Sequence, residues 1–130
     1  FEAEFHSRFS DLAGRLSAPF PHTMRWNAPI ADIRRLQDPR TTDSERSRLE
    51  SAMYGAEHTN GAFPISDAGC ATWDFLVVAG PEAGHVWRDG RADYRGLWPH
   101  EIDGQRLTFT DWWASWMRAQ MQHLLGLGRK

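Results

Sequence analysis

One cysteine, one lysine and no long hydrophobic run are the main absences in this sequence of 130 residues. The single cysteine, Cys70, excludes an intrachain disulfide and is typical of proteins from a reducing compartment. No apolar run approaches the ~18–20 residues that a membrane-spanning helix needs, and no signal-peptide pattern is visible. We therefore expect a cytoplasmic protein without membrane contact, although the sequence starts at Phe1 and leaves room for an upstream segment.

Charge is nearly balanced, with 15 Lys and Arg residues against 17 Asp and Glu residues. The resulting net charge of -2 does not favour a surface for direct nucleic-acid binding. Hydrophobic residues make up 41% of the chain and charged residues 25%, both within the range of globular proteins. Length and composition together predict one domain over residues 1–130 with a core of its own.

Apolar spacing predicts helices in the amino-terminal half of the chain. The first spans 1–16, and one or two helical turns are expected within 29–39. A further helix is expected over 41–54, where Thr42 and Glu45 form a capping-box pattern. Its apolar stripe is narrow, so we expect this helix to lie at the periphery.

Short strands separated by turn signals are predicted from residue 60 onward. Their expected positions are 63–65, 73–79, 85–87 and 97–99. The strand at 73–79 is apolar on both faces and should be central, forming an antiparallel hairpin with 85–87. We expect a turn at 66–69 and a solvated loop at 88–96, where Arg and Asp alternate.

The strongest helix signal closes the chain, over residues 109–117. Thr108 and Asp111 form a capping box, and large apolar side chains recur at helical spacing. The apolar positions are Phe109, Trp112, Trp113, Trp116 and Met117. We expect this face to pack on the sheet, so that Trp116→Ala would cost about 3–5 kcal/mol of stability.

Signatures of catalysis are weak. Cys70 could pair with His58 or His85 and with Asp67 or Asp74, but the sequence around it does not match a papain-like nucleophile. A buried structural thiol is the simpler interpretation. The six histidines lack the spacing of a zinc site, and no phosphate-binding loop is present. We therefore predict a protein that is not an enzyme, with no catalytic residues, no metal and no cofactor.

An ordered series of motifs between residues 60 and 117 resembles the SUKH superfamily, which contains the fungal Smi/Knr cell-wall-assembly regulators and many bacterial immunity proteins. The pieces are Gly69-Cys70, Leu76-Val77-Val78, Gly80-Pro81-Glu82-Ala83-Gly84, Val86-Trp87 and the helix from Phe109 through Trp116, in which Trp113 stands where the family has Tyr. The family's amino-terminal motifs are not recognisable before Leu16. Either the sequence begins part-way through such a domain, or this chain has a divergent start.

The resemblance implies an α+β fold with a mostly antiparallel sheet flanked by helices. It also implies a non-enzymatic protein-binding module, for which we expect an immunity protein that neutralises a bacterial toxin domain such as a nuclease. The alternative is a regulatory scaffold of the Smi/Knr type that binds a peptide of a cellular partner.

A protein-binding surface is predicted on loops that combine aromatic and arginine anchors with acidic groups. Its residues are Trp26, Asp67, Trp87, Arg88, Asp89, Arg91, Asp93 and Tyr94. The competing interpretation makes Trp87 a core residue and the segment that follows it a solvated loop.

Overall fold

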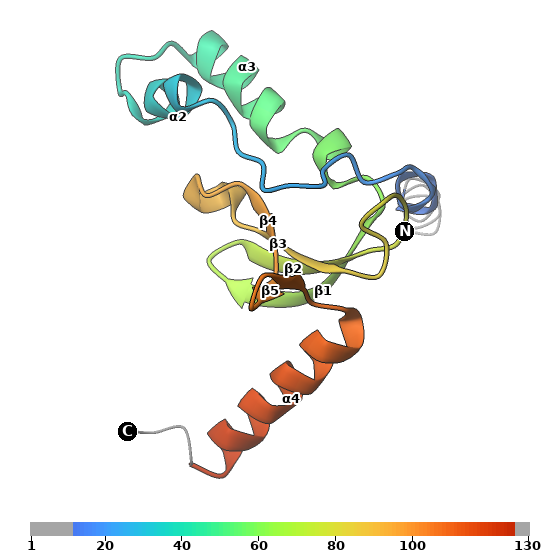
Figure 1. Ribbon diagram of the computed structural model, residues 1–130. Coiled ribbons are helices and arrows are strands. Elements are labelled where there is room, and N and C mark those ends of the chain that lie inside the picture. Colours follow the sequence, from blue (N-terminus) through green and yellow to red (C-terminus); the bar gives the residue numbers. More distant parts are fainter. Residues whose placement is uncertain (1–11, 127–130) are drawn as a thin grey trace, which may run out of the picture.

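The apolar runs between residues 62 and 99 form a four-stranded antiparallel sheet in the order β1-β2-β3-β4 (Figure 1). Its strands are β1 (Ala62–Gly69), β2 (Thr72–Val77), β3 (Val86–Asp89) and β4 (Leu97–Pro99). A two-stranded sheet of β5 (Glu101–Ile102) and β6 (Gln105–Arg106) follows. The figure shows a computed structural model that describes residues 12–126. The predicted α+β class is confirmed.

The main core lies on one face of this sheet. Phe20 packs edge-on against Trp87, with ring centroids 4.9 Å apart. It lies in the extended segment that precedes residue 30. The other buried members of this cluster are Ala62, Phe75, Val77 and Leu97. Trp87 is fully buried, which confirms its interpretation as a core residue and removes its side chain from the predicted binding surface.

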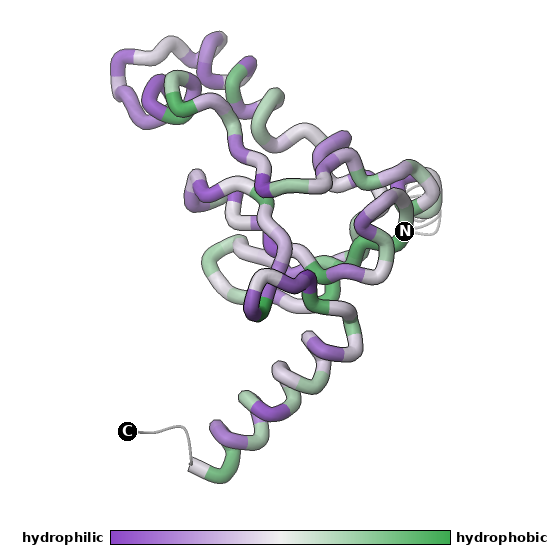
Figure 2. Tube along the Cα trace, viewed as in Figure 1, coloured by the Kyte–Doolittle hydropathy of each residue, from purple (hydrophilic) through white to green (hydrophobic). Residues whose placement is uncertain are grey.

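A second, smaller core joins the predicted helices at 29–39 and 41–54, which the structure places at α2 (Ile30–Gln37) and α3 (Asp43–Tyr54). Its buried members are Leu36, Leu49 and Met53. Thr42 caps α3 as predicted, because its side chain accepts a hydrogen bond from the backbone N–H of Glu45. Figure 2 shows that hydrophilic residues occupy much of this helix pair, as expected for a peripheral element.

Two predicted connections differ in the structure. The turn expected at 66–69 belongs to β1, and the hairpin turns instead at Cys70 and Ala71, whose φ angles of 52° and 58° suit a tight two-residue connection. Cys70 is exposed there, so the expectation of a buried thiol is wrong. The expected solvated loop at 88–96 is also wrong in part, because β3 continues to Asp89 and a 3-10 turn, η2 (Arg91–Asp93), buries Arg91.

The predicted helix at the end of the chain is present but longer, as α4 (Phe109–Leu124), and Thr108 caps it. Its predicted packing is wrong, because Trp112 is buried while Trp113 and Trp116 are exposed. A hydrogen bond from Phe109 N–H to the Gly84 carbonyl fixes the first turn at the end of the sheet, and the axis then points away from the body (Figure 1). Replacing Trp116 should therefore cost much less than full burial implies.

The predicted first helix falls mainly outside the described residues; within them, 12–17 are helical. Across residues 12–126, no helix combines the length and the hydrophobicity needed to cross a membrane.

Candidate functional site

The strand register brings distant residues of the predicted surface into one row across the sheet. Asp67 lies opposite Trp73, Trp73 opposite Asp89, and Asp89 opposite Leu97. Trp26 continues the row through an isolated bridge to Leu97. Residues directly opposite one another project from the same face of a sheet. Asp67, Asp89 and Trp26 therefore share one row, and Trp73, which was not among the predicted site residues, stands between the two aspartates.

A groove of about 340 Å³ opens beside this row. The strands contribute apolar walls, and residues from the amino-terminal helix and η1 (Ala56–Thr59) close it. Its lining residues are Leu12, Arg15, Thr59, Ala62, Pro64, Trp73, Phe75, Asp89 and Arg91. The Trp73 side chain is 43% exposed, which is unusual for so large an apolar group in the middle of a sheet row. We define these residues together with Asp67 as the Trp73 face.

Arg91 is a structural member of the Trp73 face. Its guanidinium forms two hydrogen bonds to Asp89, of 3.0 Å to Oδ1 and 2.7 Å to Oδ2. It also donates to the backbone carbonyl of Met53, and the Tyr54 hydroxyl donates to the Arg91 carbonyl. These bonds tie the end of α3 to the end of β3, so the pair Asp89–Arg91 holds the groove wall in place.

The opposite face of the sheet carries a buried carboxylate. Asp74 accepts two hydrogen bonds from the Arg88 guanidinium, of 2.8 and 3.0 Å, and lies 2.7 Å from His100 Nε2. Burial opposes ionisation of Asp74, but the hydrogen bonds from His100 and Arg88 outweigh it and lower its pKa to about 2. Arg88 was predicted as a partner contact, and the structure engages it in this pair.

A second network of the same kind lies between the turn after β2 and the β5–β6 hairpin. The Glu82 carboxylate is 2.9 Å from His85 Nδ1 and accepts a 2.8 Å hydrogen bond from Arg106 Nε. Arg106 also donates to the Thr23 carbonyl, so the network pins the chain before α2 to the hairpin. Burial opposes ionisation of Glu82, but its bonds to His85 and Arg106 lower its pKa. In both networks an arginine neutralises the carboxylate, which suits a structural role.

Trp26 stacks against two histidines that also contact each other. Its ring centroid is 4.0 Å from that of His58 and 5.2 Å from that of His22. His58 Nε2 lies 2.9 Å from the Ala52 carbonyl and must carry a proton there, so neutral His58 accepts at Nδ1 from His22 Nε2, 3.3 Å away. Burial, together with the nearby His58 and Arg91, lowers the pKa of His22.

Acidification should loosen this stack. Because the folded pKa of His22 lies below the ordinary value of 6.5, the unfolded chain takes up the proton more readily. The contribution of His22 to stability is therefore complete above pH 6.5 and declines as the pH falls below it. Melting temperatures measured between pH 7.5 and 5.5 should show this decline, and His22→Gln should flatten it. An equal slope in His22→Gln would contradict the assignment.

The remaining predicted residues lie apart from these networks. Asp93 is exposed in η2, and Tyr94, half-buried with φ of 58°, packs on the smaller core. Asp67 is exposed and accepts a hydrogen bond from the Gly69 N–H. Among residues 12–126, no group of three or more His, Cys, Asp or Glu residues is placed to hold a metal ion.

Comparisons of the chain with protein-family models, with curated proteins and with solved structures found no match. The resemblance to the SUKH superfamily stays a prediction from the sequence.

Proposed function

We propose that this chain is a non-enzymatic protein-binding module of the immunity type, which occludes a toxin domain through the Trp73 face. The observation that carries this proposal is the half-exposed Trp73 beside an apolar groove, flanked by charged groups of both signs. Tryptophan and arginine are enriched among residues that dominate protein interfaces. Strands and the Asp89–Arg91 pair hold this face in place. Binding a partner therefore costs little conformational entropy, because few side chains or loops have to become ordered.

Two exposed carboxylates at the edge of the Trp73 face and beside it support a basic partner. Asp67 is exposed at one end of the row, where its carboxylate accepts a hydrogen bond from the Gly69 N–H of its own turn. Asp93 is exposed in η2, which follows directly after the Asp89–Gly90 end of the row. Such rim carboxylates accelerate association with a positively charged nuclease domain and add salt dependence.

The proposal is tested by examining the genes next to the one for this chain and co-expressing the chain with any toxin domain encoded there. Cell survival is expected, together with a complex that survives purification. No rescue of the cells would overturn the immunity function for that toxin.

Within such a complex, Trp73→Ala is expected to raise the Kd by about 30-fold or more, as for a central aromatic anchor. The matched control is Phe63→Ala. Phe63 is also 43% exposed, but it pairs with Leu76 and so projects from the other face of the same two strands. Titration calorimetry should show a near-unchanged Kd for this control. Equal losses in both variants, or none in Trp73→Ala, would place the contact elsewhere.

A further inference from the structure

The side of α4 that faces away from the β5–β6 hairpin is a largely apolar surface. Its exposed members, which we call the α4 stripe, are Phe109, Trp113, Trp116, Met117, Met121 and Leu124. The aromatic rings stack along the helix, with centroids 6.2 Å apart for Phe109 and Trp113 and 5.4 Å apart for Trp113 and Trp116. Their exposed fractions reach 47% at Trp113 and 82% at Leu124.

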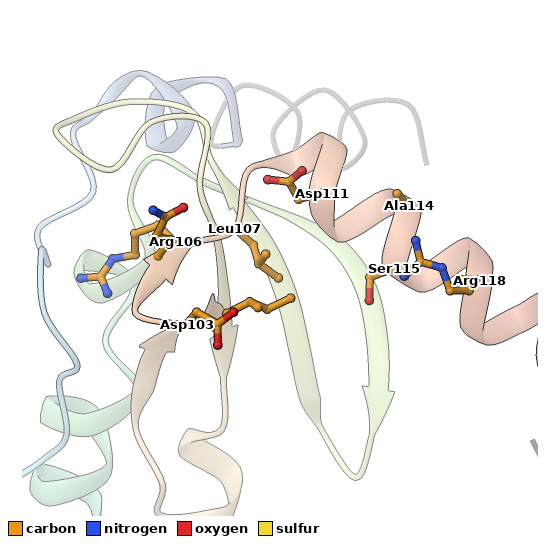
Figure 3. A pocket seen from close by; sticks show the side chains of 9 residues that line it. Asp103, Arg106, Leu107, Asp111, Ala114, Ser115 and Arg118 are labelled. Carbon is orange, nitrogen blue, oxygen red and sulfur yellow. The ribbon is translucent and has the colours of Figure 1, made fainter.

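The polar side of α4 already has a neighbour. Asp111, Ala114, Ser115 and Arg118 line a groove of about 510 Å³ whose far wall is the β5–β6 hairpin and Leu107 (Figure 3). By helical spacing Asp111, Ser115 and Arg118 lie on the side of α4 away from the stripe, and Ala114 lies at its edge. Within residues 12–126, α4 makes no extended contact with another helix or strand, so the stripe has no cover there.

We infer that the α4 stripe pairs with the α4 stripe of a second copy of this chain, the two helices running antiparallel. The stripe has two unlike halves: aromatic rings from Phe109 to Trp116, and flexible Met and Leu side chains from Met117 to Leu124. An antiparallel pair centred between Trp116 and Met117 sets Phe109 level with the partner copy's Leu124. Rings then lie against side chains that adapt to them, and methionine sulfur contacts aromatic rings favourably.

The area of the stripe fits a two-fold pair. With about 200 Å² for each fully exposed large side chain, the stripe offers on the order of 600 Å² of apolar surface per copy. Pairing two copies buries at most roughly 1,200 Å², the lower end of specific protein interfaces, before any polar rim is added. A surface of this size lies at the upper end of what monomeric proteins commonly expose.

Charge also favours a second copy over a charged partner. The Asp and Arg side chains of α4, Asp111 in its first turn and Arg118 in its middle, both line the groove on the other side of the helix. The polar residues among the stripe are Thr110, Gln120 and His123. The Thr and Gln side chains are uncharged, and His123 is uncharged when its imidazole is neutral. Two identical stripes therefore meet without like-charge repulsion, and they give a charged ligand nothing to pair with.

The oligomeric state tests this inference directly. Sedimentation equilibrium of the whole 14.9 kDa chain is expected to give twice that mass at micromolar concentration. Met117→Glu, which places a carboxylate at the centre of the pair, should weaken dimerisation about 100-fold or more. Gln122→Glu adds the same charge on the groove side of α4 and should leave the dimer intact. Because both sites are exposed and Glu favours helix, circular dichroism should show both variants folded.

Cross-linking tests the direction of pairing. In a Cys70→Ser background, Trp113→Cys mixed with Gln120→Cys should form a disulfide between copies, because an antiparallel pair sets these positions level. Trp113→Cys alone should not, since its two sulfurs would lie about 10 Å apart along the axis. A monomeric mass for the wild-type chain would overturn the inference. The stripe would then be covered by something other than a second copy, such as another segment of the chain, a different protein or a lipid surface. A dimer that Met117→Glu leaves unchanged would also overturn it.

Discussion

Replacing Trp87 with alanine is expected to lower the free energy of unfolding by about 3–5 kcal/mol, among the largest effects of any single change in this chain. Trp87 is the largest fully buried side chain and packs edge-on against Phe20. Removing the indole leaves a cavity at the centre of the main core, which the surrounding strands can fill only in part. Urea unfolding followed by circular dichroism would measure the loss.

Trp87→Phe is the informative control. The indole N–H of Trp87 is buried and finds no hydrogen-bond partner among residues 12–126, so the native side chain already bears the cost of an unsatisfied donor. Phenylalanine removes that donor and keeps most of the aromatic contact with Phe20. We expect it to cost about 1–2 kcal/mol less than alanine does. A loss below about 1 kcal/mol in Trp87→Ala would show that this cluster is not the main core.

The elements that the sequence predicts well are those whose signals are local. The caps at Thr42 and Thr108 each depend on neighbouring residues and form as expected. The strand predicted at 73–79 also forms, as β2 (Thr72–Val77), which ends two residues earlier. Backbone hydrogen bonding and capping act within a few positions, so the pattern alone determines them. The central position of β2 followed from its apolar character on both faces.

The packing of α4 could not be predicted in this way. A helix with an apolar stripe is expected to bury it, but periodicity does not say against which surface. Here the direction of α4 is fixed by its connection, through the hydrogen bond between Phe109 N–H and the Gly84 carbonyl. That constraint joins residues distant in sequence, and no pattern around Trp113 or Trp116 records it.

The candidate site was predicted in part. Asp67, Asp89 and Trp26 do fall into one row, but this depends on strand register, which the sequence did not provide. Trp73 was overlooked because its strand was expected to be covered on both faces. That expectation predicted a buried Trp73, whereas the structure has a groove beside it and leaves it partly exposed. Arg88 and Arg91 look like interface anchors by composition, whereas the fold gives each a carboxylate partner, Arg88 within the sheet and Arg91 in η2.

Asp74→Asn is expected to destabilise the protein by about 3 kcal/mol, because it removes one partner of a buried ion pair. Only 4% of Asp74 is exposed, and its carboxylate holds both the Arg88 guanidinium and His100. The amide cannot accept from both Arg88 nitrogens, so a positive charge on β3 loses its partner. Asp67→Asn is the control: this carboxylate is exposed on β1, and its loss should change stability by less than about 0.5 kcal/mol.

The Asp74 carboxylate should also make the stability of the fold sensitive to acid over a defined pH range. The pKa of Asp74 is about 2 in the folded chain, against an ordinary value of 3.8, so the folded state favours the ionised form. Its contribution is therefore complete above pH 3.8 and is lost as the pH falls from 3.8 through 2, since protonation breaks the bonds to Arg88 and His100. With allowance for screening by solvent at Arg88 and His100, the loss amounts to roughly 1–2 kcal/mol. Unfolding free energies measured from pH 5 to pH 2.5 should fall less steeply in Asp74→Asn than in the wild-type chain, and parallel curves would show that Asp74 titrates normally.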